Sequence, residues 1–174
     1  MMTCTHSIMF HHFHDNQHAK GQGSIDAEQF EQIINWLKAK YNLIGAKEYL
    51  VKYENDNLGI NDICLSFDDA LLCQYDIAIP ILEKYQIDAF FFIYSCVFSD
   101  KPDNLEVFRY FRNNYYTEMD DFFIEFFEVV DERLGDEIVV HRQSFNEIDY
   151  LIEFPFYTQN DKWFRYLRDQ VLVN

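Results

Sequence analysis

The first apolar block of the chain is short and aromatic, and a long polar stretch follows it. Ser7 to Phe13 contains mostly apolar and aromatic residues, and His14 to Ser24 is polar and holds two glycines. A short apolar run that breaks into a glycine-containing polar segment is typical of a buried strand that leads into a loop. The pattern therefore predicts a strand followed by a loop.

The next block has the period of a helix and a start signal in front of it. Asp26 is a good N-cap residue, and Gln29 follows it at the spacing of a capping box. Apolar residues then recur at i, i+3, i+4 and i+7, namely Phe30, Ile33, Ile34 and Leu37. This spacing gives one apolar stripe, which predicts an amphipathic helix.

Strand-like and helix-like segments continue to alternate up to about residue 98. Ala46 to Lys52 has the pattern of a short helix or turn, and Ile63 to Phe67 (ICLSF) that of a buried strand. Asp76 to Tyr85 predicts a helix with Pro80 near its first turn, where a missing N–H costs little. Ala89 to Tyr94 (AFFFIY) predicts another buried strand. Alternating strands and helices indicate an α/β fold with a parallel sheet.

From Ser99 onward the apolar residues have helical spacing. The three stripes consist of Met119, Phe122, Phe123, Phe126, Phe127 and Val130; Phe145, Ile148, Leu151 and Ile152; and Trp163, Leu167 and Val171. We interpret residues 1–174 as a single domain, with a βαβ part over 1–98 and a mainly helical insertion or extension over 99–174.

Composition and charge exclude several classes of function. The chain has 174 residues, of which 49% are hydrophobic, and its net charge is -16. A phosphate backbone repels such a surface, so we expect no nucleic-acid partner. No segment is long and apolar enough to span a bilayer, and the N-terminal residues do not resemble a signal peptide. The four cysteines (Cys4, Cys64, Cys73 and Cys96) form no CxxC pair and are interpreted as reduced thiols, so we expect a cytoplasmic protein.

The sharpest candidate for chemistry is the pair Asp68-Asp69, which directly follows the ICLSF strand. Neighbouring side chains on a strand point to opposite faces, but beyond the strand end both carboxylates can turn toward one cleft. Parallel α/β folds place their active sites at that end of the strands. The alternative is a helix-capping aspartate with a solvated neighbour, which the spacing alone leaves open.

The segment from Ile63 to Ser95 resembles the first signature of the polysaccharide deacetylase family (NodB homology, similar to carbohydrate esterase family 4). In that signature a strand ends in TFDDG, a helix contains Pro-x-Leu, and a strand like Ala-Thr-Phe-Phe follows. Here the corresponding residues are FDDA, Pro80-Ile81-Leu82 and AFFFI, and the upstream SIMFHHF is similar to the family's first strand. The resemblance covers the N-terminal part, about Ser7 to Ser95.

The resemblance implies a function and a set of roles. The expected reaction is metal-dependent hydrolysis of an acetyl group on an N-acetylated sugar of a surface polysaccharide or its precursor. Asp68 would be the general base and Asp69 a ligand of a divalent metal, most often zinc in this family. His11 and His12, at the end of the first strand, would contact the carbohydrate substrate.

Two features depart from the family pattern. Ala70 stands where the family has glycine, and no HxxxH motif follows the AFFFI strand, where His141 is the sole histidine. Catalytic zinc normally has three protein ligands. The missing ligands would come from a longer parent chain, from a partner chain, or not at all. The alternative function is therefore a non-catalytic, deacetylase-derived module or fragment that binds a carbohydrate or a protein partner.

Five of the six histidines lie within a short N-terminal stretch, namely His6, His11, His12, His14 and His18. Such a cluster could bind a transition metal by itself, although no cysteine or carboxylate has finger-like spacing here. The other interpretations are strand-end histidines that line the sugar cleft and ordinary loop histidines.

The fold expected from these observations is a partial or distorted (β/α) barrel with a helical second half. The predicted strands are too few to close a barrel, so an open sheet edge must be covered by the helical half or by another chain. A homodimer or a partner chain would provide such a cover.

Overall fold

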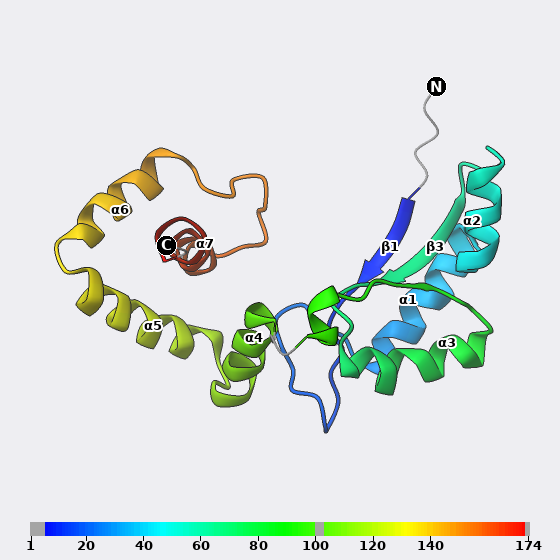
Figure 1. Ribbon diagram of the computed structural model, residues 1–174, viewed down its shortest axis with the longest axis horizontal. Helices are drawn as coiled ribbons and strands as arrows, with labels where there is room; N and C mark the ends of the chain where they lie inside the picture. Colours follow the sequence, from blue (N-terminus) through cyan, green and yellow to red (C-terminus); the bar gives the residue numbers. More distant parts are fainter. Residues whose placement is uncertain (1–5, 100–102, 173–174) are drawn as a thin grey trace. The chain divides into compact units, whose positions relative to one another are not determined.

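The computed structural model describes residues 6–99 and 103–172 (Figure 1). The chain divides into two compact units, Met1–Asn113 and Asn114–Asn174. The first unit holds the sheet and the second is helical. The prediction of a single domain over 1–174 is not tested by this division and stays a prediction.

The first unit is built on a small parallel sheet with β3 at its centre. Its four strands are β1 (His6–Phe10), β2 (Asn42–Leu43), β3 (Asp62–Phe67) and β4 (Phe90–Phe91). β3 pairs in parallel with each of the other three. In the register of β1 and β3, Phe10 lies opposite Phe67, so the carboxyl ends of the two strands are level.

Helices connect these strands, as the βαβ pattern predicted. Between the strands lie α1 (Ala27–Lys40), α2 (Ala46–Glu54), the π-helical turn η1 (Gln74–Ala78) and α3 (Ile79–Tyr85), and the 3-10 turn η2 (Ser95–Phe98) and α4 (Asn104–Tyr115) follow β4. The capping box at the start of α1 is confirmed, because the Asp26 side chain accepts from the Gln29 N–H and the Gln29 side chain accepts from the Asp26 N–H.

The core of this unit lies between β3 and the helices. All six residues of β3 are buried, which is typical of a central parallel strand covered on both faces. Phe10, Phe13, Phe30 and Phe67 pack ring against ring, with centroids 5.0–6.2 Å apart. The predicted stripe of α1 is confirmed, since Phe30, Ile34 and Leu37 are buried and Ile33 packs against the core.

The strand predicted over Ala89 to Tyr94 is shorter and more exposed than the sequence pattern indicates. Only Phe90–Phe91 pairs with β3. Phe92 and Ile93 are 55% and 56% exposed. The physical reason is that β3 is the single described strand beside β4, so the pairing stops where β3 ends at Phe67. An apolar run alone does not reveal whether a strand is central or at an edge.

The second unit consists of helices around a separate aromatic core. These are α5 (Met119–Leu134), α6 (Glu137–Glu147), α7 (Gln159–Tyr166) and the π-helical turn η3 (Leu167–Val171). The buried residues of this core cluster are Val130, Phe145, Trp163, Tyr166 and Leu167, and Phe122, Phe123 and Phe164 are buried in the same unit. The first and third predicted stripes are therefore helical, as expected.

The second predicted stripe, Phe145 to Ile152, is wrong as a continuous helix. α6 ends at Glu147, and the following residues form turns. Asp149 and Leu151 have φ of 47° and 56°, in the left-handed region that interrupts a right-handed helix. The residues after Glu147 form turns instead of a helix, and Tyr150 packs against the core.

The α/β class is confirmed, as a small parallel sheet with helices. The barrel remains a prediction, since the described strands form an open four-stranded sheet.

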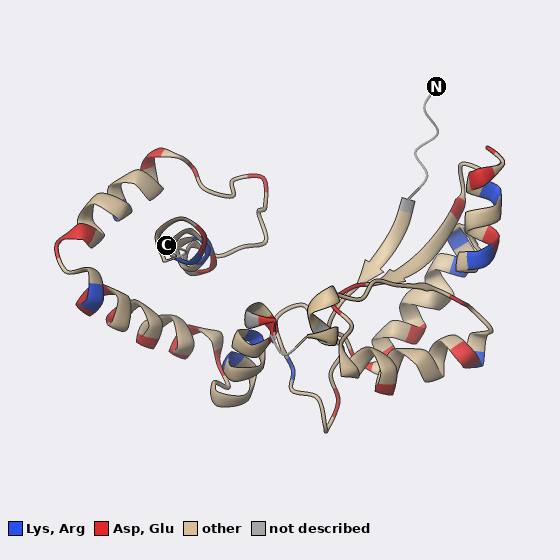
Figure 2. Ribbon diagram, in the orientation of Figure 1, with Lys and Arg blue, Asp and Glu red and all other residues tan. Residues whose placement is uncertain are grey.

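Within the described ranges, none of the helices is long and apolar enough to cross a membrane. Cys64, Cys73 and Cys96 are free thiols, and Cys4 lies outside the described residues. Acidic residues occur on the helices of both units, with fewer basic residues among them (Figure 2).

Candidate functional site

The predicted site residues lie at the level carboxyl ends of β1 and β3. The Asp68 N–H donates to the Phe10 carbonyl at 3.1 Å, which continues the pairing of the two strands by one residue. His11 and Asp68, the first residues after β1 and β3, therefore lie next to each other at the same edge of the sheet. This is the edge at which parallel α/β folds bind their ligands.

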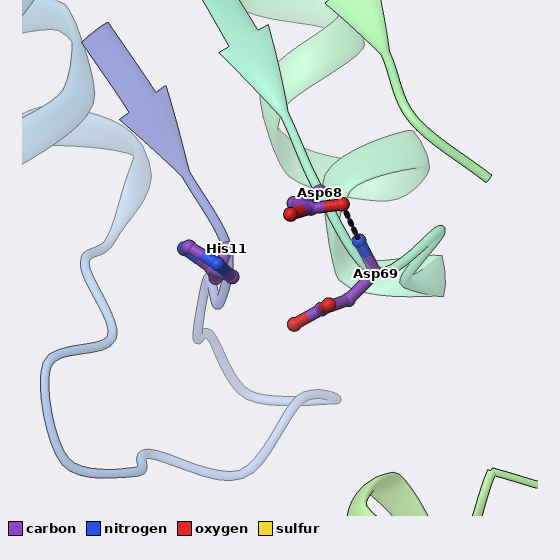
Figure 3. Close-up of side chains that lie close together, drawn as sticks. All are labelled: His11, Asp68 and Asp69. Carbon is purple, nitrogen blue, oxygen red and sulfur yellow. Dashed lines mark hydrogen bonds between the residues drawn. The ribbon is translucent and has the colours of Figure 1, made fainter. Parts of the chain in front are cut away.

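His11, Asp68 and Asp69 form a compact group at this edge (Figure 3). One ligand atom from each of the three side chains lies within 4.8 Å of the others. Asp69 is buried, and His11 and Asp68 are half-buried. Asp68 also accepts a hydrogen bond from the Asp69 N–H at 3.1 Å through Oδ1. Both aspartates thus lie in one group of side chains.

The backbone after β3 explains how two adjacent aspartates reach one place. Asp69 and Ala70 have φ of 75° and 51°, so two successive residues adopt the left-handed conformation. This turn ends the strand alternation that would otherwise point the two side chains to opposite faces. Glycine adopts that conformation without strain, whereas an L-residue such as Ala70 does not. The turn forms here with alanine in place.

Gln74 holds the two chain segments of the site together. Its Nε2 donates to the carbonyl of His11 at 2.9 Å and also to the carbonyl of Asp68. Gln74 is only 2% exposed, so these hydrogen bonds are shielded from water. The side chain comes from η1, the element that follows the turn after β3. One buried amide thus fixes the distance between the ends of β1 and β3.

Both carboxylate oxygens of Asp69 have partners in the first unit. The Tyr94 hydroxyl donates to Oδ1, and the Arg109 Nη1 donates to Oδ2 at 3.2 Å. The hydrogen bond to the Asp69 carboxylate raises the pKa of Tyr94, so this phenol stays protonated at neutral pH. Arg109 also pairs with Glu106 on the same helix.

His12 is held neutral in this environment. The pKa of His12 is lowered to about 4, chiefly by burial; the Arg109 charge also lowers it, and the Asp69 charge opposes the shift. The pKa of Glu106 is raised, chiefly by burial, while Arg109 opposes that shift. A neutral imidazole is an acceptor and a metal ligand at physiological pH.

A second group of ligand atoms shares Asp69 with the first. One ligand atom each of His12, Asp69 and Glu106 lies within 4.8 Å of the others. Glu106 comes from α4, which begins at Asn104. The carboxyl edge of the sheet therefore offers two overlapping sets of three side chains, of which the second includes a helix distant in sequence.

All four predicted site residues, Asp68, Asp69, His11 and His12, belong to at least one of these two groups, and their roles stay predictions. The other N-terminal histidines lie elsewhere: the His14 ring meets the Ser24 hydroxyl at 2.9 Å, and the His18 ring meets Asp76 at 2.9 Å. His141 belongs to the second unit. Among the described histidines, the cluster therefore does not gather as one metal site.

Four residues of the site are not marked out by the sequence: Gln74, Tyr94, Glu106 and Arg109. Three of them follow β4 in the chain and carry no recognised motif. The one available signal is the spacing of Glu106 and Arg109, because residues at i and i+3 share a helix face. That spacing does not reveal that the shared face meets Asp69.

No protein-family model matches the chain, and neither does any curated protein. Among solved structures, the chain is similar to a de-N-acetylase from Aggregatibacter actinomycetemcomitans, with 27% identity and a TM-score of 0.41 over 49% of this chain and 35% of that one. It is also similar to the Streptococcus pyogenes deacetylase PplD, solved in complex with acetate, with 24% identity and a TM-score of 0.39 over 51% of this chain and 42% of that one. The matches thus span about half of this chain and less than half of each solved structure.

Proposed function

We propose that the carboxyl edge of the sheet is a carbohydrate deacetylase site. It would hydrolyse the acetyl group of an N-acetylated sugar with the help of a divalent metal, and zinc is the metal that we propose. The observation that carries the proposal is the grouping of His11, Asp68 and Asp69 at two level strand ends. The motif FDDA lies at the turn where the resemblance to polysaccharide deacetylases requires its two aspartates to converge.

The two aspartates suit different tasks because their surroundings differ. Asp69 is buried, and its carboxylate pairs with the Arg109 guanidinium, so it lies where a positive charge is favoured. Asp68 is half-buried, and one of its oxygens is engaged by the backbone N–H of Asp69. Its other oxygen can therefore accept a proton from water, which is the role of a general base. A bound divalent metal supplies polarisation of the acetyl carbonyl and a more acidic water.

The reaction balances with one water molecule. The water oxygen adds to the acetyl carbon as Asp68 takes its proton, and the carbon–nitrogen bond then breaks. The proton passes to the leaving nitrogen, so the products are acetate and the free amino sugar. His11 lies across from Asp68 at the end of β1, where it can donate or accept a hydrogen bond to the sugar.

The test is release of acetate from N-acetylglucosamine oligomers by the zinc-supplied protein. Asp68→Asn keeps the volume of the side chain and removes its basicity, so we expect turnover to fall by at least about 100-fold while zinc binding persists. Asp56→Asn is the matched control, since Asp56 is exposed and its φ of 54° is tolerated by asparagine. Turnover that survives Asp68→Asn would overturn the assignment of the base.

A second function is favoured by the contacts of Asp69. Tyr94 and Arg109 engage both oxygens of this carboxylate, so the chain is stable there without a metal. The chain would then be a non-catalytic module that binds a carbohydrate or a protein partner. Calorimetry separates the two: stoichiometric zinc binding that Asp69→Ala abolishes supports the enzyme, whereas oligosaccharide binding without zinc binding or acetate release supports the module.

A further inference from the structure

The absence of HxxxH leaves Asp69 short of metal partners, and the structure brings two other side chains to it. His12 is the second residue after β1, Asp69 is the second after β3, and Glu106 lies in the first turn of α4. Their exposed side-chain fractions are 25%, 5% and 20%, so the group is largely shielded from water. Three separate chain segments thus converge on one partly buried place.

A single nitrogen atom lies at the centre of this convergence. The Arg109 Nη1 is 3.2 Å from Asp69 Oδ2 and 3.3 Å from His12 Nε2, and it also contacts Glu106 Oε1. This nitrogen carries two hydrogens, so it cannot give a straight hydrogen bond to all three acceptors. A position with three acceptor atoms around it suits a metal cation, because a metal ion can bind several ligand atoms at once.

We propose that His12, Asp69 and Glu106 are the three protein ligands of a divalent metal, and that Arg109 occupies the metal position when no metal is bound. The inference rests on the proposed function, because that proposal makes Asp69 a metal ligand. His12 and Glu106 would take the place of the two histidines of HxxxH. One imidazole and two carboxylates are ordinary zinc ligands, and a three-ligand site leaves a position open for water.

The geometry requires only small movements. Zinc bonds to nitrogen and oxygen are about 2.0–2.2 Å long, so ligand atoms in a tetrahedral site lie roughly 3.3–3.6 Å apart. The ligand atoms here lie within 4.8 Å of one another, and His12 Nε2 is 3.7 Å from Glu106 Oε2. The largest change is the withdrawal of the Arg109 side chain, which is 30% exposed and can turn toward water. His12 becomes a metal ligand in this arrangement, and His11 and Asp68 remain on the substrate side.

Zinc calorimetry on the full chain tests the ligand set without any measurement of activity. We expect one zinc per chain, with His12→Ala and Glu106→Gln each weakening the zinc affinity at least about tenfold. Arg109→Gln removes the competing charge, so we expect zinc to bind more tightly than in the wild type, by about tenfold. Glu128→Gln and His141→Ala, whose side chains lie in the second unit, are matched controls that should leave the affinity unchanged.

Circular dichroism confirms that each variant is folded, and His12→Asn serves as a second variant if His12→Ala does not fold. Visible absorption of the cobalt-loaded protein reports tetrahedral coordination, and its loss in Glu106→Gln would support the assignment of Glu106. If zinc binds only to the Arg109→Gln variant and that binding is lost when His12 is also replaced, the ligand set is supported, and Arg109 occupies the metal position in the wild type.

The proposal is overturned if His12→Ala and Glu106→Gln bind zinc as the wild type does. It is also overturned if neither the wild type nor Arg109→Gln binds zinc. Because no sugar is present, these outcomes are distinct from a failure of the deacetylase proposal, which is read from acetate release and its dependence on Asp68.

Discussion

At the scale of single residues, the turn after β3 carries an avoidable strain. Ala70 has a φ of 51°, a conformation that costs an L-residue about 1 kcal/mol relative to glycine. Its side chain is exposed, so nothing in the packing requires a methyl group there. The same turn places Asp69 inside the site.

We therefore expect Ala70→Gly to raise the free energy of unfolding by about 1 kcal/mol. Ala39→Gly is the matched control, since Ala39 is exposed within α1 and glycine there should lower that free energy by about 1 kcal/mol. Urea titration followed by circular dichroism measures both. Equal destabilisation by the two substitutions would contradict the strained turn.

The second prediction at this scale concerns the protonation of His12. Its folded-state pKa of about 4 lies below the ordinary value of 6.5, so between these values the unfolded chain binds more protons than the folded one. The contribution of His12 to stability is therefore complete above pH 6.5 and is lost as the pH falls toward 4.

Proton NMR of the metal-free protein should show one imidazole titrating near pH 4, and that resonance should disappear in His12→Gln. The same variant should have a shallower loss of stability between pH 6.5 and 4. The raised pKa of Glu106 acts in the opposite direction above pH 4.5, so the comparison is made between the variant and the wild type. A His12 midpoint near 6.5 would refute the buried, neutral imidazole.

At the scale of elements, the site depends on a π-helical turn that delivers one buried amide. Gln74 begins η1 and bridges the carbonyls that follow β1 and β3. A wider turn is frequently found at functional sites, because it reorients a side chain without ending the helix. Here the reoriented side chain links two strand ends that otherwise share only backbone pairing.

Gln74→Met keeps the size of the side chain and removes its donors, which leaves two buried carbonyls without this partner. We expect the free energy of unfolding to fall by about 1–3 kcal/mol. Gln17→Met on the exposed loop after β1 is the control and should change it by less than about 0.5 kcal/mol. Differential scanning calorimetry checks both, and an unchanged Gln74→Met protein would show that water replaces the amide.

At the scale of the whole molecule, the excess of acidic residues produces repulsion between like charges. The chain carries 30 acidic and 14 basic residues, for a net charge of -16. Both units bear acidic residues along their helices (Figure 2). Such self-repulsion weakens the compact state, and dissolved salt reduces it.

We expect the melting temperature to rise between 0.01 M and 0.1 M sodium chloride at neutral pH, since the screening length falls from about 30 Å to about 10 Å over that range. Calorimetric scans at constant buffer composition measure the shift. A melting temperature that falls with salt would mean that attractive ion pairs, such as Lys84 with Glu31, outweigh the repulsion.

The sequence by itself determined the elements whose signals are local. The capping box of Asp26 and Gln29, the stripe of α1 and the buried run of β3 each depend on neighbours within a few residues, and all are confirmed. The position of Asp68 and Asp69 directly after β3 was also predicted, because the end of a strand is marked by residues close to it in the sequence. The extent of β4 and the end of α6 were not, since each depends on contacts or backbone turns that periodicity does not record.

Tertiary structure decided the composition of the site. The register of β1 against β3 brings His11 to Asp68, and α4 brings Glu106 and Arg109 to Asp69. Arg109 is 40 residues from Asp69 in the chain, and no motif connects them. Contacts between such distant segments follow from how the elements pack rather than from their own periodicity. For this physical reason the sequence predicted the two aspartates and the two histidines after β1, and only the structure added the residues from η1, Tyr94 and α4.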